Sequence, residues 1–188
     1  MNPELLPISL PVFALIWSAA CWDLRCRRIP NGLVLTGVVV GMAVHLGLGG
    51  FAGLLDALAG LGVGLAILLP GYLVGTTGAG DVKLMAAVGT FLGPFYAMLA
   101  GLASIAVGGL IGLGFLALAG LSSRAPAPWS RYGLMLKTLF VTGRPVYLAP
   151  EKGEVMGRKF PFAVSIAVGT SSLVIWQFWL SSQIGVNA

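Results

Sequence analysis

Six apolar stretches occupy most of this 188-residue chain, and few charged side chains interrupt them. A helix needs about 20 mostly apolar residues to cross the hydrocarbon core of a bilayer. The pattern therefore predicts an all-α membrane protein with six transmembrane helices. Gly93-Pro94 is the only turn signal between the fourth and fifth stretches, and the fourth is short for a span. The stretches cover approximately residues 5–21, 33–48, 51–74, 82–95, 96–121 and 160–180.

The composition excludes a water-soluble globular protein. Only 9% of the residues are charged, 57% are hydrophobic, and the mean hydropathy is +0.96. Soluble domains carry about 25% charged residues. We expect one integral-membrane domain over residues 1–188, with residues 122–159 as a cytoplasmic or interfacial connection before the last span. Within it, the mixed aromatic and basic run at 129–140 predicts a helix lying in the membrane interface.

The basic residues predict an orientation. The chain has 11 Lys and Arg: three follow the first stretch, one follows the third, and seven lie in residues 122–159. With six spans, these three connections face the same side of the membrane. Because cytoplasmic connections are enriched in Lys and Arg, this side is predicted to be cytoplasmic and both termini to be outside. Glu4 and Asp56 then fall on the outer side.

Asp23 and Asp81 are the acidic residues that adjoin apolar stretches on the predicted cytoplasmic side. Asp23 begins the run DLRCRRIPN, and Asp81 ends the run GAGD. Ionisable residues next to a membrane span usually have a function. Two carboxylates that meet in a poorly hydrated pocket tend to share one proton. The ionised partner can activate a water molecule against a peptide carbonyl, and the protonated partner can help the amine to leave.

Each polar residue near the predicted spans also has a structural interpretation. Asp81 can cap the N-terminus of the fourth helix, and Asp23 can pair with the arginines that follow it. Lys83 can extend to the lipid headgroups or tune the site. His45 fits a packing or interface position near the outer end of the second span. Asp56 suits the dipole of the first turn of the third helix, and we exclude it from the site because it falls on the opposite side of the membrane from Asp23 and Asp81.

No metal, cofactor or nucleic acid is expected. Cys21 and Cys26 are the only cysteines, and His45 is the only histidine. Structural zinc sites need four such ligands. The net charge of +5 is explained by the orientation of the protein in the membrane, and an anionic partner is not needed to account for it.

Glycines and one proline carry further predictions about helix packing. Glycines four residues apart let membrane helices approach closely. We predict this role for the pairs at 37 and 41, 71 and 75, and 108 and 112. Pro70 is predicted to kink the third helix near its cytoplasmic end.

Three short elements together resemble the prepilin peptidase family, which are type IV leader peptidases of the GxGD aspartic type. They are Asp23 with its basic cluster and IPN, the run GAGDVK at 78–83, and PFA at 161–163, which opens the last span. The resemblance implies that Asp23 and Asp81 are the catalytic aspartates. It also implies that Gly78 and Gly80 are the motif glycines, and we add Lys83 as a residue that shapes the site.

The resemblance implies removal of a short basic leader peptide from type IV pilin-like precursors at the cytoplasmic face of the bacterial inner membrane. The expected partners are a prepilin or pseudopilin helix, the lipid bilayer and a pilus assembly machinery. Large members of the family carry a cytoplasmic insert with paired CxxC zinc motifs and also N-methylate the new terminus. This chain has only two cysteines and resembles the small members that serve Flp (tight-adherence) pili, so no methyltransferase activity is expected.

Three alternatives stay open at this point. A small transporter or ion-binding protein would use the same aspartates to hold a proton or cation. A non-catalytic pilus assembly factor would tolerate replacement of both. An archaeal preflagellin peptidase would share the chemistry and differ in substrate.

Overall fold

The structure is a computed structural model that describes residues 6–121, 134, 137–138, 141 and 161–186. The described secondary structure is helical, as predicted, whereas Glu4 and most of residues 122–159 lie outside the described residues. The chain divides into two units, Met1–Gly108 with Pro161–Ala188, and Gly109–Phe160. The main helices are α1 (Leu6–Cys26), α2 (Asn31–Val74), α3 (Ala79–Leu121) and α5 (Phe162–Val186).

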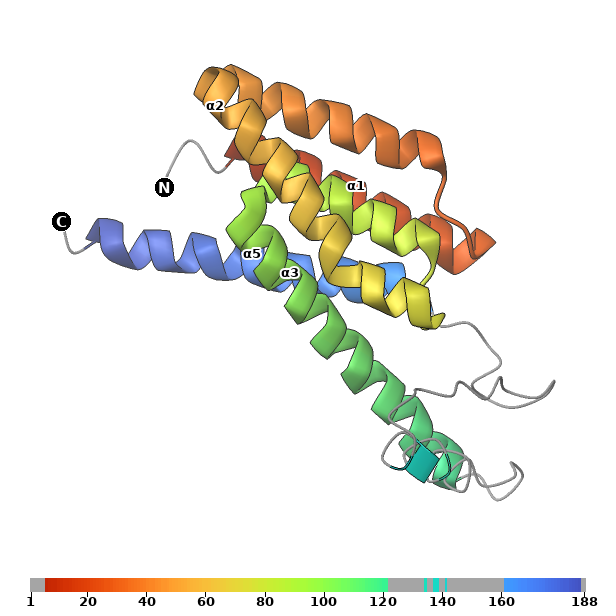
Figure 1. The fold of residues 1–188 in the computed structure, drawn as a ribbon. Helices are drawn as coiled ribbons and strands as arrows, with labels where there is room; N and C mark the ends of the chain where they lie inside the picture. Colours follow the sequence, from red (N-terminus) through yellow and green to blue (C-terminus); the bar gives the residue numbers. More distant parts are fainter. Residues whose placement is uncertain (1–5, 122–133, 135–136, 139–140, 142–160, 187–188) are drawn as a thin grey trace. The chain divides into compact units, whose positions relative to one another are not determined.

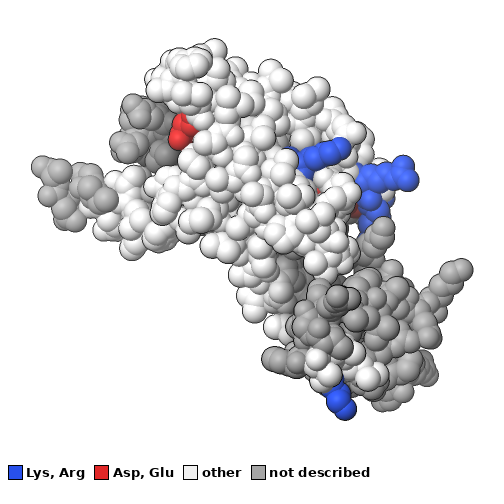
Figure 2. All heavy atoms as spheres, in the orientation of Figure 1, with Lys and Arg blue, Asp and Glu red and all other residues white. Residues whose placement is uncertain are grey.

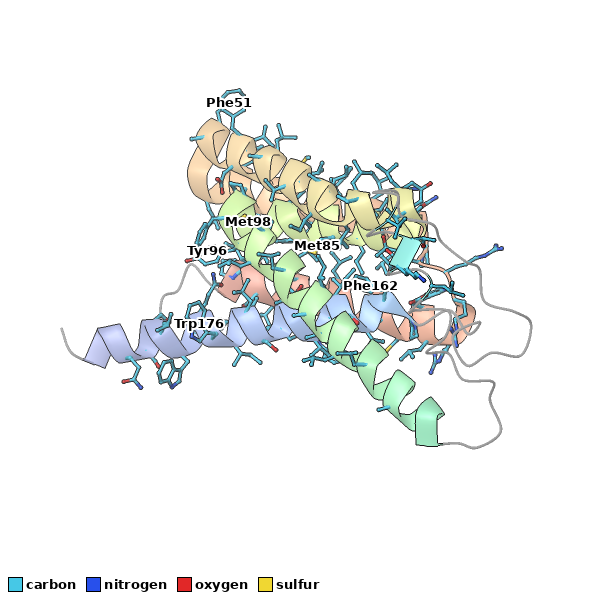
Figure 3. All side chains as sticks on the ribbon, turned by 60° about the horizontal axis from the view of Figure 1, so that its bottom comes forward. Phe51, Met85, Tyr96, Met98, Phe162 and Trp176 are labelled. Atoms are coloured by element: carbon cyan, nitrogen blue, oxygen red, sulfur yellow. The ribbon has the colours of Figure 1, made fainter. Side chains whose placement is uncertain are left out.

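Within the part of the chain that the structure describes, four helices are long and apolar enough to cross a membrane. Their outward side chains are largely hydrophobic, and Phe51 and Trp179 expose 72% and 57% of their surface. Figure 3 shows Phe51 and Trp176 pointing away from the helices, whereas Met85 lies among them. A surface of this kind is suited to lipid. The chain is therefore a membrane protein, and the number of spans and the orientation stay predictions.

Helices α2 and α3 are each interrupted by one glycine. At 44 residues, α2 would be about 66 Å long if it were straight, which is twice the thickness of the hydrocarbon core. It breaks at Gly50 (φ 58°), and α3 breaks at Gly93 (φ 71°). Glycine adopts positive φ without steric penalty. In Figure 1, α2 reverses direction and α3 also turns back. The breaks fall at or near the two predicted boundaries, so the four helices contain six helical segments.

The first segment of α3 forms the centre of the core. Leu84, Met85 and Val88 have no exposed surface, and Phe91 exposes 1%. Protein therefore surrounds this segment on nearly all sides, which explains how a helix too short for a bilayer is accommodated. The core residues from the other helices are Val12, Leu15, Ile16, Ala19, Ala20, Val34, Leu68, Ala163, Ile166, Ala167 and Leu173.

Backbone contacts at glycines hold the second segment of α2 against the first segment of α3. A Cβ atom on Gly60 would collide with the carbonyl oxygen of Gly89, and one on Gly64 would collide with that of Met85. Close approach of this kind replaces the hydrophobic drive that is absent between helices in lipid. On the other side of the core, α1 contacts both α2 and α5.

The predicted glycine pairs have three different outcomes. The pair at 37 and 41 packs against side chains of α1 and α3, as predicted. The pair at 71 and 75 is wrong, because Gly75 is the left-handed C-cap of α2. In the third pair, Gly108 packs against Phe162, but Gly112 has no atom within 4 Å of its Cβ position. Pro70 lies inside α2, which continues unbroken to Val74.

The second unit contains part of the predicted interfacial helix. Leu134, Lys137, Thr138 and Val141 are helical. The Thr138 hydroxyl donates a 2.7 Å hydrogen bond to the carbonyl of Leu134. These positions agree with a helix near residues 129–140, and its location in the membrane interface stays a prediction.

Candidate active site

Asp23 lies on a helix, whereas the sequence predicted it in a connection. α1 continues to Cys26, five residues past the predicted end of the first span, so Asp23 is in its last turns. The side chain is 8% exposed. It continues the buried stripe formed by Ile16, Ala19 and Ala20, which follows the helical repeat of three and four residues. Asp23 is therefore directed into the bundle by the same periodicity that buries its apolar neighbours.

Arg27 ends α1 next to Asp23. Its N–H donates a 2.9 Å hydrogen bond to the carbonyl of Asp23. Arg27 has a φ of 53°, the only positive φ at a non-glycine residue among the described residues. This left-handed residue terminates the helix, a place that glycine usually takes. The charge of Arg27 also acts on the Asp23 carboxylate, so Asp23 has a basic neighbour, as the structural alternative supposed.

Asp81 is in the first turn of α3, but it is not the N-cap. The carbonyl of Gly78 accepts the N–H groups of Asp81 at 3.1 Å and Val82 at 3.3 Å, so Gly78 is the N-cap. In return, the Gly78 N–H donates a 3.1 Å hydrogen bond to Oδ2 of Asp81. This backward bond is one half of a capping box. The N-cap interpretation is therefore corrected, and the Gly78 N–H orients the carboxylate.

The structure brings the three sequence elements together. Asp81 is 8% exposed, like Asp23, and the two carboxylates are close enough for their charges to interact. The backbone N–H of Ala163 also interacts with the Asp23 carboxylate. Ala163 is in the first turn of α5, where backbone N–H groups have no partner within the helix. The sequence singled out PFA at 161–163 but did not predict that the Ala163 N–H interacts with Asp23, because a backbone group leaves no signal in the sequence.

The two motif glycines have different surroundings. A Cβ on Gly78 would lie 3.0 Å from Oδ2 of Asp81, which is too close unless the carboxylate moves. A Cβ on Gly80 would lie 3.4 Å from Cβ of Ile29, which is ordinary contact. Gly78 therefore leaves room for the carboxylate. Gly80 lies against the side chain of Ile29, so the GAGD turn packs against the IPN run there.

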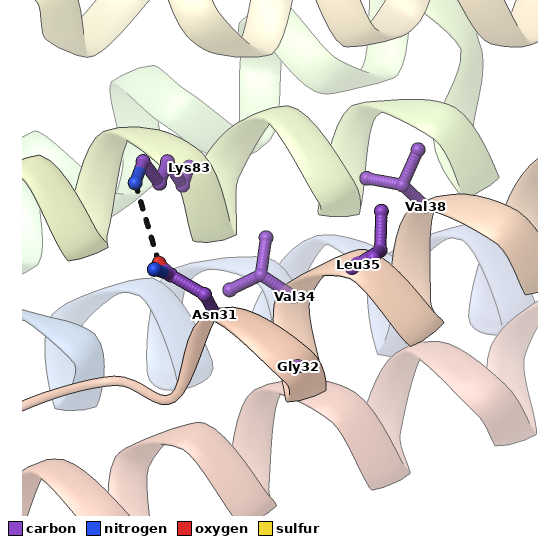
Figure 4. A pocket seen from close by; sticks show the side chains of 6 residues that line it. All are labelled: Asn31, Gly32, Val34, Leu35, Val38 and Lys83. Carbon is purple, nitrogen blue, oxygen red and sulfur yellow. Dashed lines mark hydrogen bonds between the residues drawn. The ribbon is translucent and has the colours of Figure 1, made fainter.

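Lys83 does not reach the aspartates. It is exposed on α3, and two residues along a helix place it about 200° around the axis from Asp81. Its Nζ donates a 3.3 Å hydrogen bond to Oδ1 of Asn31 at the start of α2 (Figure 4). Lys83 therefore does not contact the aspartates in this structure. Its partner Asn31 was not identified from the sequence.

The remaining polar candidates lie at the other end of the first unit. Asp56 is exposed and approaches Gly93, which is about 18 Å along α3 from Asp81. His45 Nε2 makes a 2.9 Å hydrogen bond to the carbonyl of Phe91. Figure 2 shows basic side chains gathered at one end of this unit and acidic surface at the opposite end. The structure therefore does not bring Asp56 to the aspartate pair.

The described residues offer little to a metal ion. They contain no group of three or more His, Cys, Asp and Glu side chains. Cys21 and Cys26 are free thiols, and both are exposed. Around the aspartates, the described groups are two carboxylates, backbone N–H groups and the charge of Arg27.

The model of the type IV leader peptidase family matches residues 10–113, more than half of the chain. The chain belongs to the type IV leader peptidase family. The match includes both aspartates and GAGD, whereas PFA at 161–163 lies outside it. No curated protein and no solved structure matches the chain. This leader peptidase is therefore a membrane protease by family.

Proposed function

We propose that this leader peptidase is an aspartic endopeptidase in which Asp23 and Asp81 form the catalytic dyad. The observation that carries the proposal is the convergence of two buried carboxylates from α1 and α3 within charge-interaction range. A buried carboxylate is costly next to lipid unless it has a partner or a function. Each carboxylate is also oriented by a backbone N–H, from Ala163 and Gly78 respectively.

The proposed reaction needs only water and the two carboxyl groups. One ionised carboxylate removes a proton from water as the water oxygen bonds to the peptide carbonyl carbon. The protonated partner donates a hydrogen bond to the carbonyl oxygen, where negative charge develops. The C–N bond then breaks, and the amine leaves with a proton returned by the dyad. Either aspartate can act as the general base while the other acts as the general acid. We therefore assign these two roles to the pair and not to individual residues.

The proposed substrate is the precursor of an Flp-type, type IV pilin-like protein with a short basic leader. The protein would be multi-pass in the bacterial inner membrane, with the dyad at the cytoplasmic face and both termini outside. Arg25, Arg27, Arg28 and Lys83 are exposed at the end that carries the dyad, and this supports the orientation. With only two cysteines in the chain, we propose a peptidase without the methyltransferase activity.

Co-expression with a candidate Flp-type precursor tests the dyad. Asp23→Asn and Asp81→Asn keep the size and shape of each side chain and one acceptor oxygen but remove the acid. We expect each to abolish the gel shift that reports leader removal, while the protein still inserts in the membrane. Asp56→Asn is the matched control, since Asp56 is exposed near Gly93, and we expect normal processing. Full cleavage by either dyad variant would refute the assignment.

The same variants separate the alternatives. An assembly factor would support pilus formation with both aspartates replaced. A transporter or ion-binding protein would show flux or thermal stabilisation that depends on an ion and disappears in the Asn variants. Neither behaviour is expected of the proposed peptidase.

A further inference from the structure

A shallow groove lies on the outer face of the bundle between α2 and α3, at the end that carries the aspartates. Its volume is about 350 Å³. Figure 4 shows Val34, Leu35 and Val38 of α2 along it, with the Lys83–Asn31 pair at one end. We call it the Lys83 groove. Its lining residues are Asn31, Gly32, Val34, Leu35, Val38 and Lys83.

The groove faces the surroundings of the protein and not the dyad. Leu35 exposes 65% of its surface, and Val39, one residue beyond the groove lining, exposes 57%. Lys83 is the one exposed residue between positions 81 and 91, which are otherwise buried. Since Asp81 points into the core about 200° away, an occupant of the groove would lie on the lipid side of α3.

The groove has an apolar wall and one polar end. Valine and leucine side chains supply an apolar wall, whereas the Lys83 ammonium and the Asn31 amide supply hydrogen-bond donors at the mouth. The described partner of Lys83 is a neutral amide oxygen at 3.3 Å, so its charge is not neutralised by that contact. A ligand with an anionic group next to a hydrocarbon chain would place the anionic group at the polar end and the hydrocarbon chain along the apolar wall.

We propose that the Lys83 groove binds an anionic phospholipid, with the phosphate at Lys83 and Asn31 and one acyl chain along Val34 and Val38. Basic pockets between helices on the cytoplasmic side of a membrane recognise such headgroups.

Binding here would join the starts of two helices that position the site. Lys83 follows the GAGD turn, and Asn31 follows Ile29, whose side chain meets the Cβ position of Gly80. A phosphate held by Lys83 and Asn31 would therefore link the start of α2 to the start of α3, on the face of α3 that points away from Asp81. This inference does not depend on the peptidase proposal, because its readout is lipid binding.

The test uses the full-length protein in detergent with added phosphatidylglycerol or phosphatidylcholine, and measures bound lipid by native mass spectrometry and the thermal unfolding midpoint. We expect phosphatidylglycerol to bind and raise the midpoint more than phosphatidylcholine does. Lys83→Gln is expected to weaken phosphatidylglycerol binding about five-fold, the equivalent of about 1 kcal/mol for one charge. Lys83→Arg is expected to retain binding. Arg28→Gln is the matched control, because it removes an exposed charge that does not line the groove.

Three results would overturn the inference. Equal losses in Lys83→Gln and Arg28→Gln would mean that the lipid responds only to the general charge of the surface. Competition by glycerol phosphate as strong as that by phosphatidylglycerol would mean that the apolar wall plays no part. Displacement of the lipid by a precursor helix, with protection of Leu35 from labelling, would assign the groove to the substrate.

Discussion

Replacing Gly78 with alanine tests how the dyad is held, because one methyl group is added beside one carboxylate. The backbone of Gly78 is not in the left-handed region, so alanine is accepted there without strain. Its Cβ, however, would lie 3.0 Å from Oδ2 of Asp81. The carboxylate must then move by a few tenths of an ångström. That shift weakens the 3.1 Å hydrogen bond from the Gly78 N–H that orients it.

The expected size of the effect follows from that hydrogen bond. A hydrogen bond to a charged group contributes about 1.5–3 kcal/mol. Since about 1.4 kcal/mol corresponds to a tenfold change in rate, we expect Gly78→Ala to slow leader removal between about 10-fold and 100-fold. Folding should be little affected, because Gly78 is exposed at the start of a helix.

The assay is the initial rate of precursor cleavage by purified protein, with the thermal midpoint measured in parallel. Gly62→Ala is the control, since nothing lies within 4 Å of its Cβ position, and we expect the wild-type rate. Gly80→Ala should fall between the two, because its Cβ would make ordinary contact with Ile29. A Gly78→Ala rate within twofold of wild type would refute the view that this hydrogen bond positions Asp81.

Two further predictions concern stability. Arg27→Gly should stabilise the fold by about 1 kcal/mol, because glycine accepts the positive φ of 53° at the end of α1, whereas the lost charge interaction between exposed Arg27 and Asp23 costs less. Thermal unfolding should shift upward by about 2–4 °C, and a lower midpoint would contradict the strain. Gly89→Leu should destabilise the fold by several kcal/mol, because its side chain would collide with the backbone of Gly60. Gly62→Leu is its control and should accumulate in the membrane like the wild type. Equal membrane yields of the Gly89 and Gly62 variants would show that the backbones at Gly60 and Gly89 are not in contact.

The sequence predicted the helices well, because hydropathy alone determines where a chain can lie in lipid. The turn signal Gly93-Pro94 located a break that the structure places at Gly93. The distribution of basic residues along the sequence also separated Asp56 from the aspartate pair. The end of α1 was misplaced because Asp23 and Arg25 lower the hydropathy there, although Asp23 keeps the periodicity of the buried stripe.

The surroundings of the site were less predictable, because they depend on contacts between distant segments. Nothing in the sequence indicates that the N–H of Ala163 interacts with Asp23. The same holds for Lys83, whose direction depends on the rotation of α3 about its axis. A resemblance identifies the aspartates, but only the packing shows which backbone groups orient them.

The backbone contact between Gly60 and Gly89 has a consequence for how the dyad can adjust. Helices in contact through main-chain atoms have no side chains between them that could repack, so we expect the second segment of α2 and the first segment of α3 to move together, carrying Asp81. Asp23 is on α1, whose buried contacts are made by side chains such as Leu15 and Ile16, and these can repack. A change in the gap between the two carboxylates when substrate arrives is therefore expected to come from movement of α1. Probes of that motion belong on Trp22 or Leu24, which expose 53% and 58% of their surface.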